Sequence, residues 1–115
     1  MLRGEIRRVD FGQALPSESA NQRPAVIVSN DGANSTAARL GRGVVTVAPI
    51  TSNTTRVYPF QVLLRARESG LQQDSKVQAE QVRSVSVDRI GRSLGSVPAP
   101  VMLSVDEALR LHLSL

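Results

Sequence analysis

Two short apolar runs constrain the fold of this chain more than any other feature of its sequence. Residues 24–29 (PAVIVS) and 44–50 (VVTVAPI) each have the length of a β-strand and are rich in β-branched side chains. Because neither run alternates with polar residues, we expect both faces of each strand to be buried. Turn-forming polar residues follow both runs, so each strand should end there.

The rest of the pattern adds shorter strands and one helix. Residues 76–87 (KVQAEQVRSVSV) alternate with a period of two, which predicts one strand with polar side chains on both faces. After Pro98 the apolar residues recur at three- and four-residue spacing, which predicts a C-terminal helix. A short helical turn is expected within residues 30–42. The other predicted strands cover residues 4–10, 59–65 and 91–95.

A chain of 115 residues has room for one core and is too short for two. We therefore expect a single domain over residues 1–115, mostly β, in which a small barrel or sandwich is closed by one C-terminal α-helix.

Composition excludes several kinds of site. The chain has no cysteine, which rules out disulfides, thiol nucleophiles and sulfur-bound zinc and fits a reducing compartment. Its one histidine, His112, lies near the end of the predicted helix, so we expect no metal site and no cofactor. No phosphate-binding glycine loop or metal-binding motif is present. The apolar runs are far too short to span a membrane, and a cytoplasmic protein is expected.

The charge balance points to a polyanionic partner. Lys and Arg outnumber Asp and Glu by 14 to 10, for a net charge of +4, and every basic residue except Lys76 is arginine. Guanidinium groups suit bidentate contact with phosphate, although a GC-rich genome whose codons favour arginine explains the composition equally well. The only aromatic residues are Phe11, Tyr58 and Phe60. Any single-stranded nucleic acid would therefore be held through phosphates and base edges more than by stacking.

Three polar clusters lie at the ends or on the surface of predicted strands. Arg23 precedes Pro24 at the mouth of a buried strand, where a cation would be held firmly against a phosphate, or would simply lie on a strand edge. The hydroxyl-rich run from Thr51 to Thr55 follows the second buried strand and suits either substrate contact or an ordinary turn. Gln81 and Arg83 face either a ligand or solvent.

Taken in order, five segments of this chain resemble the MazF/PemK/Kid family of toxin endoribonucleases. The segments are GEIRRVD (4–10), SESANQRPAVIVSND (17–31), VVTVAPITSN (44–53), DSKVQAEQVRSVSVDRIGRSLGSV (74–97) and VDEALRLHLSL (105–115). The resemblance implies an SH3-like barrel with a C-terminal helix that forms a homodimer. It also implies metal-independent, sequence-specific cleavage of single-stranded RNA, and a cognate antitoxin whose acidic segment blocks the enzyme.

The resemblance also assigns residues. Arg23 matches the family's catalytic arginine and Thr51 its catalytic threonine. Glu18 matches a family glutamate that is a candidate either for the proton acceptor or for a group that binds nucleobases of the RNA. These groups would act on the phosphate while the substrate's own 2′-hydroxyl attacks it. The candidate RNA-binding residues at motif-matching positions are Ser17, Asn30, Asn53, Ser75 and Gln81.

One departure from the family pattern and two other functions need to be considered. The first strand of relatives often carries aromatic residues where this chain has Arg7 and Arg8. Gyrase-poisoning toxins resemble the same barrel but act by binding a protein, with determinants on the terminal helix. A noncatalytic RNA-binding barrel is the other alternative.

Overall fold

The computed structural model describes residues 1–12 and 22–115, of which more lie in strands than in helices. Over these residues it has two short helices, one longer C-terminal helix and two 3₁₀ turns. In chain order the elements are β1 (Glu5–Asp10), β2 (Gln22–Ile27), α1 (Asp31–Leu40), β3 (Val44–Thr51), β4 (Gln61–Leu64), α2 (Ala66–Ser69), β5 (Ser75–Gln78), η2 (Ala79–Gln81), β6 (Arg83–Ser86), η3 (Val87–Arg89), β7 (Ile90–Ser96) and α3 (Ala99–Leu113).

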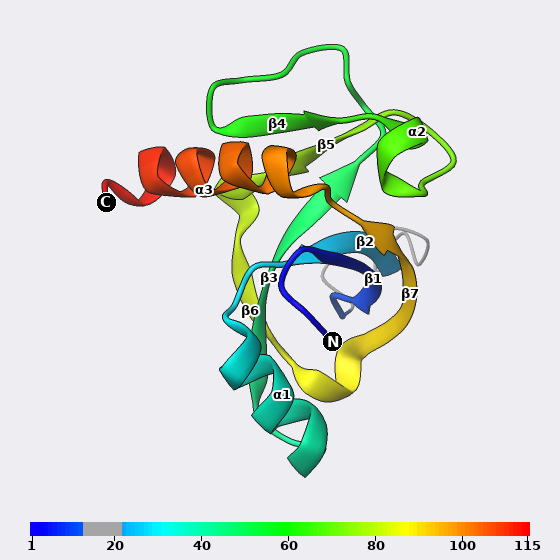
Figure 1. The fold of residues 1–115 in the computed structure, drawn as a ribbon, viewed down its shortest axis with the longest axis vertical. Helices are drawn as coiled ribbons and strands as arrows, with labels where there is room; N and C mark the ends of the chain where they lie inside the picture. Colours follow the sequence, from blue (N-terminus) through cyan, green and yellow to red (C-terminus); the bar gives the residue numbers. More distant parts are fainter. Residues whose placement is uncertain (13–21) are drawn as a thin grey trace.

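Within the described residues, one antiparallel sheet holds all seven strands, with β4, β5, β3, β2, β1 and β7 in spatial order and β6 beside β3. The strands wrap around one another, and α3 lies across one end (Figure 1). The structure confirms the predicted mostly β fold with a C-terminal helix, and it adds α2, a four-residue helix. None of the helices in this part of the chain is long and apolar enough to cross a bilayer.

The central strands are buried on both faces over most of their length, as their sequence predicts, but Val44 at the start of β3 is 61% exposed. Ala25, Val26 and Ile27 in β2 are fully buried. Val26 belongs to one apolar cluster, which includes Ile50 and residues of α3, whereas Ala25 and Ile27 belong to a second cluster beneath α1. Alternate side chains of one strand therefore serve two small cores, one on each side of the sheet.

The strand β3 pairs with two different strands along the same edge. Its residues 44–47 pair with β6, and its residues 50–51 pair with β5. Pro49, which has no N–H to donate, lies in the gap between the two pairings. β3 thus connects the larger part of the sheet, formed with β1, β2, β6 and β7, to the small part formed by β4 and β5. It ends at Thr51.

This change of partner explains why the predicted single strand over residues 76–87 is wrong. The segment is broken after Gln78 by the 3₁₀ turn η2, where the Val82 N–H donates to the carbonyl oxygen of Ala79, and it resumes as β6. One regular strand cannot make both pairings: between Val47 and Ile50 β3 has two residues, whereas between their partners Arg83 and Val77 this segment has five, and the extra residues form η2.

Two other expectations need smaller corrections. The helical turn expected within residues 30–42 is a full helix, α1, which Asn30 caps and Gly41 ends in a left-handed conformation. The strand expected to start at Pro24 starts at Gln22. Pro24 is tolerated inside β2 because pairing with β3 begins only at Ala25.

Candidate active site

Arg23 extends from β2 across the end of β3 and reaches β5. Its Nη2 atom donates to the Ile50 carbonyl oxygen at 3.3 Å and to Gln78 Oε1 at 2.8 Å. Both hydrogen bonds to described residues come from Nη2, so the guanidinium is anchored through this one nitrogen. Nε and Nη1 make no hydrogen bond within residues 1–12 and 22–115, and they can meet a ligand.

Thr51 is the last residue of β3 and is partly buried. Its Oγ1 atom accepts a hydrogen bond of 3.3 Å from the Asn53 N–H, and Asn53 Oδ1 accepts one of 3.3 Å from the Thr55 N–H. These contacts form successive side-chain turns, the ordinary use of such residues at a strand end. The Thr51 hydroxyl accepts in this arrangement, so its own proton is available to another acceptor.

Arg23 and Thr51 line one open cavity of about 610 Å³. Ser75, at the start of β5, lines it as well, with its Oγ donating to the Gln73 carbonyl oxygen at 3.0 Å. The rest of the wall comes from β1, β7 and the segment after α2. The full lining is Arg8, Arg23, Pro24, Ile50, Thr51, Ser52, Gly70, Leu71, Gln72, Gln73, Ser75, Arg92, Ser93 and Leu94. We call this cavity the arginine pocket.

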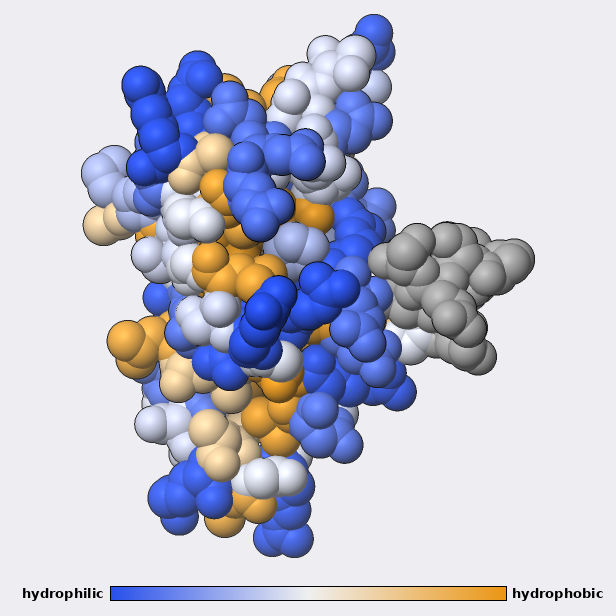
Figure 2. Space-filling model, turned by 90° about the vertical axis from the view of Figure 1, so that its right-hand side faces the viewer, coloured by the Kyte–Doolittle hydropathy of each residue, from blue (hydrophilic) through white to orange (hydrophobic). Residues whose placement is uncertain are grey.

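The arginine pocket lacks negative charge among the residues that the structure describes. Its lining contains three guanidinium groups and no Asp or Glu. Figure 2 faces the side of the molecule on which α2 and β7 lie in Figure 1, and this surface is mostly hydrophilic with small apolar patches. A concave site whose described charges are all positive attracts phosphate groups.

The other predicted site residues lie elsewhere. Asn30 caps α1, with its Oδ1 accepting from the Ala33 N–H at 2.8 Å; Asn53 lies in the turn after β3; exposed Gln81 belongs to η2. None of these three lines the arginine pocket. The predictions for Ser17 and Glu18 lie outside the described residues.

Three residues near the site were missed by sequence reasoning. Gln78 holds the Arg23 side chain, and Arg8 and Arg92 line the arginine pocket. The only signal in the sequence was the paired arginine at residues 7 and 8, where relatives carry aromatic residues. Nothing in the period-two pattern around Gln78 distinguished it from its neighbours.

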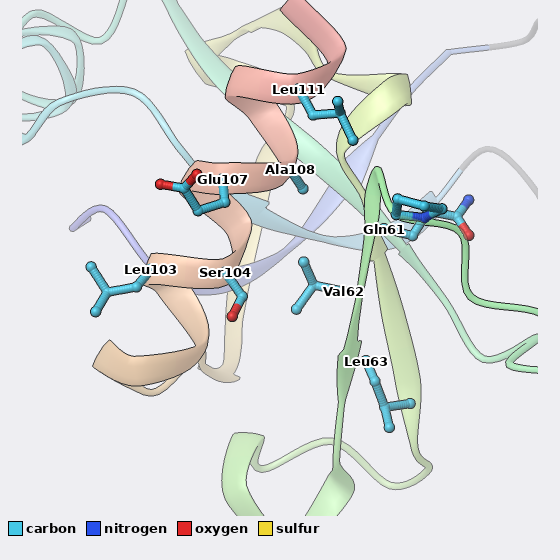
Figure 3. Close-up of a pocket in the computed structure, with 9 residues that line it drawn as sticks. Gln61, Val62, Leu63, Leu103, Ser104, Glu107, Ala108 and Leu111 are labelled. Carbon is cyan, nitrogen blue, oxygen red and sulfur yellow. The ribbon is translucent and has the colours of Figure 1, made fainter.

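A second cavity, of about 640 Å³, lies between α3 and β4. In Figure 3, Ser104 and Ala108 of α3 lie across from Val62 of β4. Its only charged lining residue among those described is Glu107, so it lacks the cations and the hydroxyl cluster of the arginine pocket. Over the same residues, no three His, Asp or Glu side chains gather closely enough to hold a metal ion.

Proteins of similar sequence are endoribonucleases. The chain is 60% identical to endoribonuclease MazF9 of Mycobacterium tuberculosis, over all of this chain and 98% of that protein. It is 29% identical to endoribonuclease EndoA of Bacillus subtilis, over 98% of this chain and 94% of that one.

Solved structures and a family profile agree with these relatives. A mycobacterial endoribonuclease in complex with its cognate antitoxin superimposes with a TM-score of 0.78 at 27% identity, over all of this chain and 96% of that one. The profile of the PemK-like, MazF-like toxins of type II toxin–antitoxin systems matches residues 2–113. The chain therefore belongs to the PemK-like and MazF-like toxins of type II toxin–antitoxin systems.

Proposed function

We propose that this MazF-like endoribonuclease toxin is a cytoplasmic enzyme that cleaves single-stranded RNA at specific sequences without a metal ion. The observation that carries the proposal is the shared position of Arg23 and Thr51 on the wall of the arginine pocket. The two residues come from different strands. Because they line one cavity, the cation and the hydroxyl can both contact the same phosphodiester.

In the proposed reaction the substrate supplies the nucleophile. The 2′-oxygen of one ribose forms a bond to the adjacent phosphorus and loses its proton, while the bond from phosphorus to the 5′-oxygen breaks and that oxygen takes up a proton. The products are a 2′,3′-cyclic phosphate and a 5′-hydroxyl. The protein must align these groups, offset the charge that grows on the phosphoryl oxygens, and assist the proton transfers.

Arg23 is suited to the second of these tasks. Its guanidinium is a cation that offers several N–H donors in a plane. The bonds to Gln78 and Ile50 fix its position before substrate arrives, so little reorganisation is needed during the reaction. Thr51 donates its hydroxyl proton to the same phosphate. Glu18 is proposed as the base that accepts the 2′-hydroxyl proton.

Base contacts would set the cleavage sequence. Ser17, Asn30, Asn53, Ser75 and Gln81 are proposed as the polar residues that contact splayed-out bases. Ser75 has the strongest support because it lines the arginine pocket beside Thr51. Asn30 and Asn53 already use their side-chain oxygens in a cap and a turn, which leaves their amide N–H groups for RNA.

Two protein partners are also proposed. An antitoxin with an acidic segment would fill the arginine pocket, whose described lining holds only positive charge, and so compete with RNA. A second copy of this chain would form a homodimer. Its support is the set of exposed leucines on α3, including Leu103 and Leu111, which a water-soluble monomer would rarely leave uncovered together.

The test is a cleavage assay on a long synthetic RNA in the presence of EDTA. We expect discrete fragments with 2′,3′-cyclic phosphate and 5′-hydroxyl ends. Replacing the 2′-hydroxyl by hydrogen at one cleavage site should abolish that cut and leave the others. RNA that is bound but left intact would indicate a noncatalytic RNA-binding barrel, and neither binding nor cleavage would favour a toxin that acts by binding a protein.

A further inference from the structure

We propose that Arg8 and Arg92 form a second phosphate subsite in the arginine pocket, which holds a phosphate of the RNA strand other than the one being cleaved. This inference rests on the proposed RNA cleavage and specifies how the substrate is held. It concerns two residues outside the predicted catalytic pair, and it starts from an irregularity in the pairing of β1 with β7.

A β-bulge brings the two arginines together. In the pairing of β1 with β7, Arg7 lies opposite Ser93 and Val9 lies opposite Ile90. One residue of β1, Arg8, therefore faces two residues of β7, Gly91 and Arg92. Bulges of this kind redirect a side chain and are common beside functional sites.

Gly91 allows the backbones to approach closely at this point. A Cβ atom on residue 91 would lie 2.9 Å from the carbonyl oxygen of Arg8, closer than real side chains come. The absence of a side chain thus keeps the bulge tight and holds Arg92 beside Arg8. Both arginines line the arginine pocket, into which Arg23 and Thr51 also project.

Neither Arg8 nor Arg92 forms an ion pair with another described residue. Two nearby arginines do form ion pairs: Arg7 of β1 with Glu5 at 3.1 Å, and Arg89, the last residue of η3 before β7, with Asp10 at 3.7 Å. Among the described residues, Arg8 makes one side-chain hydrogen bond, from its Nε to the neutral Gln22 Oε1 at 3.2 Å, and no ion pair. Among residues 1–12 and 22–115, Arg92 takes part in no ion pair or side-chain hydrogen bond.

Three guanidinium groups that line one cavity make it favourable for anions. Arg23 is tied to β5 by Gln78, whereas the other two guanidinium groups come from β1 and β7, so we assign Arg8 and Arg92 to a different phosphate from that of Arg23. An RNA strand carries a phosphate at every nucleotide, and the neighbour of the scissile phosphate enters the same cavity. A planar guanidinium binds phosphate through two parallel N–H donors, so Arg8 and Arg92 suit this neighbour.

The first experiment measures how kcat/KM for a cleaved RNA depends on salt concentration. Each phosphate contact adds about 0.7 to the negative slope of log(kcat/KM) against log salt for a single strand. We expect the double variant Arg8→Gln, Arg92→Gln to lose about that much slope and about tenfold in kcat/KM at low salt. The double variant Arg39→Gln, Arg42→Gln is the matched control: it also removes two positive charges, near the end of α1 and away from the arginine pocket, and should keep the wild-type slope.

The second experiment locates the phosphate by ethylating single phosphates of an end-labelled RNA. With the wild-type enzyme, we expect ethylation of one phosphate next to the scissile phosphate to prevent cleavage of the RNA. The double variant should lose this sensitivity, and Arg8→Lys with Arg92→Lys should restore part of it. Circular dichroism and urea unfolding would verify that all variants are folded.

The possible results separate this inference from the proposed function. If the wild-type protein leaves RNA intact, the proposed function is wrong, and so is the subsite that depends on it. If the wild type cleaves but the double variant keeps both the salt slope and the ethylation pattern, the function stands and the subsite is wrong.

Discussion

Gln78 Oε1 accepts a hydrogen bond of 2.8 Å from Nη2 of Arg23, so a β5 side chain holds a β2 side chain at the end of β3. The contact orients the guanidinium without neutralising it, because an amide is uncharged. A carboxylate at the same place would compete with the phosphate for the arginine. Gln78 is therefore a positioning residue for Arg23.

We predict that Gln78→Leu lowers kcat by about tenfold and leaves KM nearly unchanged. The substitution keeps the size of the side chain but removes the acceptor, so Arg23 binds substrate in a less favourable orientation. Steady-state kinetics on one cleavable RNA would measure both constants.

A double-mutant cycle distinguishes positioning from a general loss of structure. If Gln78 acts through Arg23, then Gln78→Leu should have almost no further effect in an Arg23→Ala background. Equal effects in both backgrounds would show that Gln78 acts independently of Arg23.

Replacing Arg23 itself should lower the cleavage rate far more than replacing Gln78. We predict that Arg23→Ala slows cleavage by about 100-fold or more, by analogy with the loss of one preorganised donor to a developing oxyanion. Arg23→Lys should recover only part of this, since an ammonium lacks the planar set of donors. Single-turnover rates measure the effect, and Arg39→Ala in the exposed last turn of α1 serves as a control. Near-wild-type cleavage by folded Arg23→Ala would contradict the proposed mechanism.

The role of the Thr51 hydroxyl can be separated from that of its methyl group. Thr51→Val keeps the shape but removes the O–H, and we expect it to reduce kcat by about tenfold or more. Thr51→Ser keeps the hydroxyl and should stay within a few-fold of the wild type. The opposite order would mean that Thr51 serves packing at the end of β3 and not the chemistry.

Much of this architecture follows from local sequence patterns. The two apolar runs predict central strands with both faces buried, and the change to a helical period predicts α3, because burial and periodicity are properties of each segment alone. The bulge opposite Arg8 and the break after Gln78 depend instead on which strands pair, and pairing between distant segments leaves no periodic trace. Placing Arg23 and Thr51 on one pocket needed the resemblance as well, since each strand end alone fits an ordinary turn.

The pKa of Glu5 leads to a prediction about stability. Burial raises this pKa, but hydrogen bonds from Arg7 and Ser93 and the charge of Arg7 lower it more, so it lies below its ordinary value of 4.5. The ionised carboxylate therefore stabilises the folded state above pH 4.5, and this contribution is lost as the pH falls through the lowered pKa.

We expect Glu5→Gln to be less stable than the wild type at neutral pH and the difference to shrink as the pH falls below that value. Urea unfolding at several pH values would measure it. A difference that stays constant with pH would show that the Glu5 side chain acts through packing and not through its charge.

Gly95 provides a last test, of how the wall of the arginine pocket is supported. A Cβ atom on residue 95 would lie 2.0 Å from the carbonyl oxygen of Ser69, at the end of α2. Gly95→Ala must therefore push α2 away from β7 and displace the segment from Gly70 that lines the pocket. We expect a loss of roughly 1–3 kcal/mol or more in the free energy of unfolding, as for overpacking in a core, together with slower cleavage.

Gly41→Ala is the matched control. Gly41 also has a positive φ, of 66°, but a Cβ there would meet nothing within 4 Å, so only backbone strain of about 1–2 kcal/mol is expected and cleavage should be unaffected. Urea unfolding and cleavage rates of the two variants would be compared side by side. If Gly95→Ala cleaves RNA as fast as Gly41→Ala, the contact between α2 and β7 does not determine the shape of the arginine pocket.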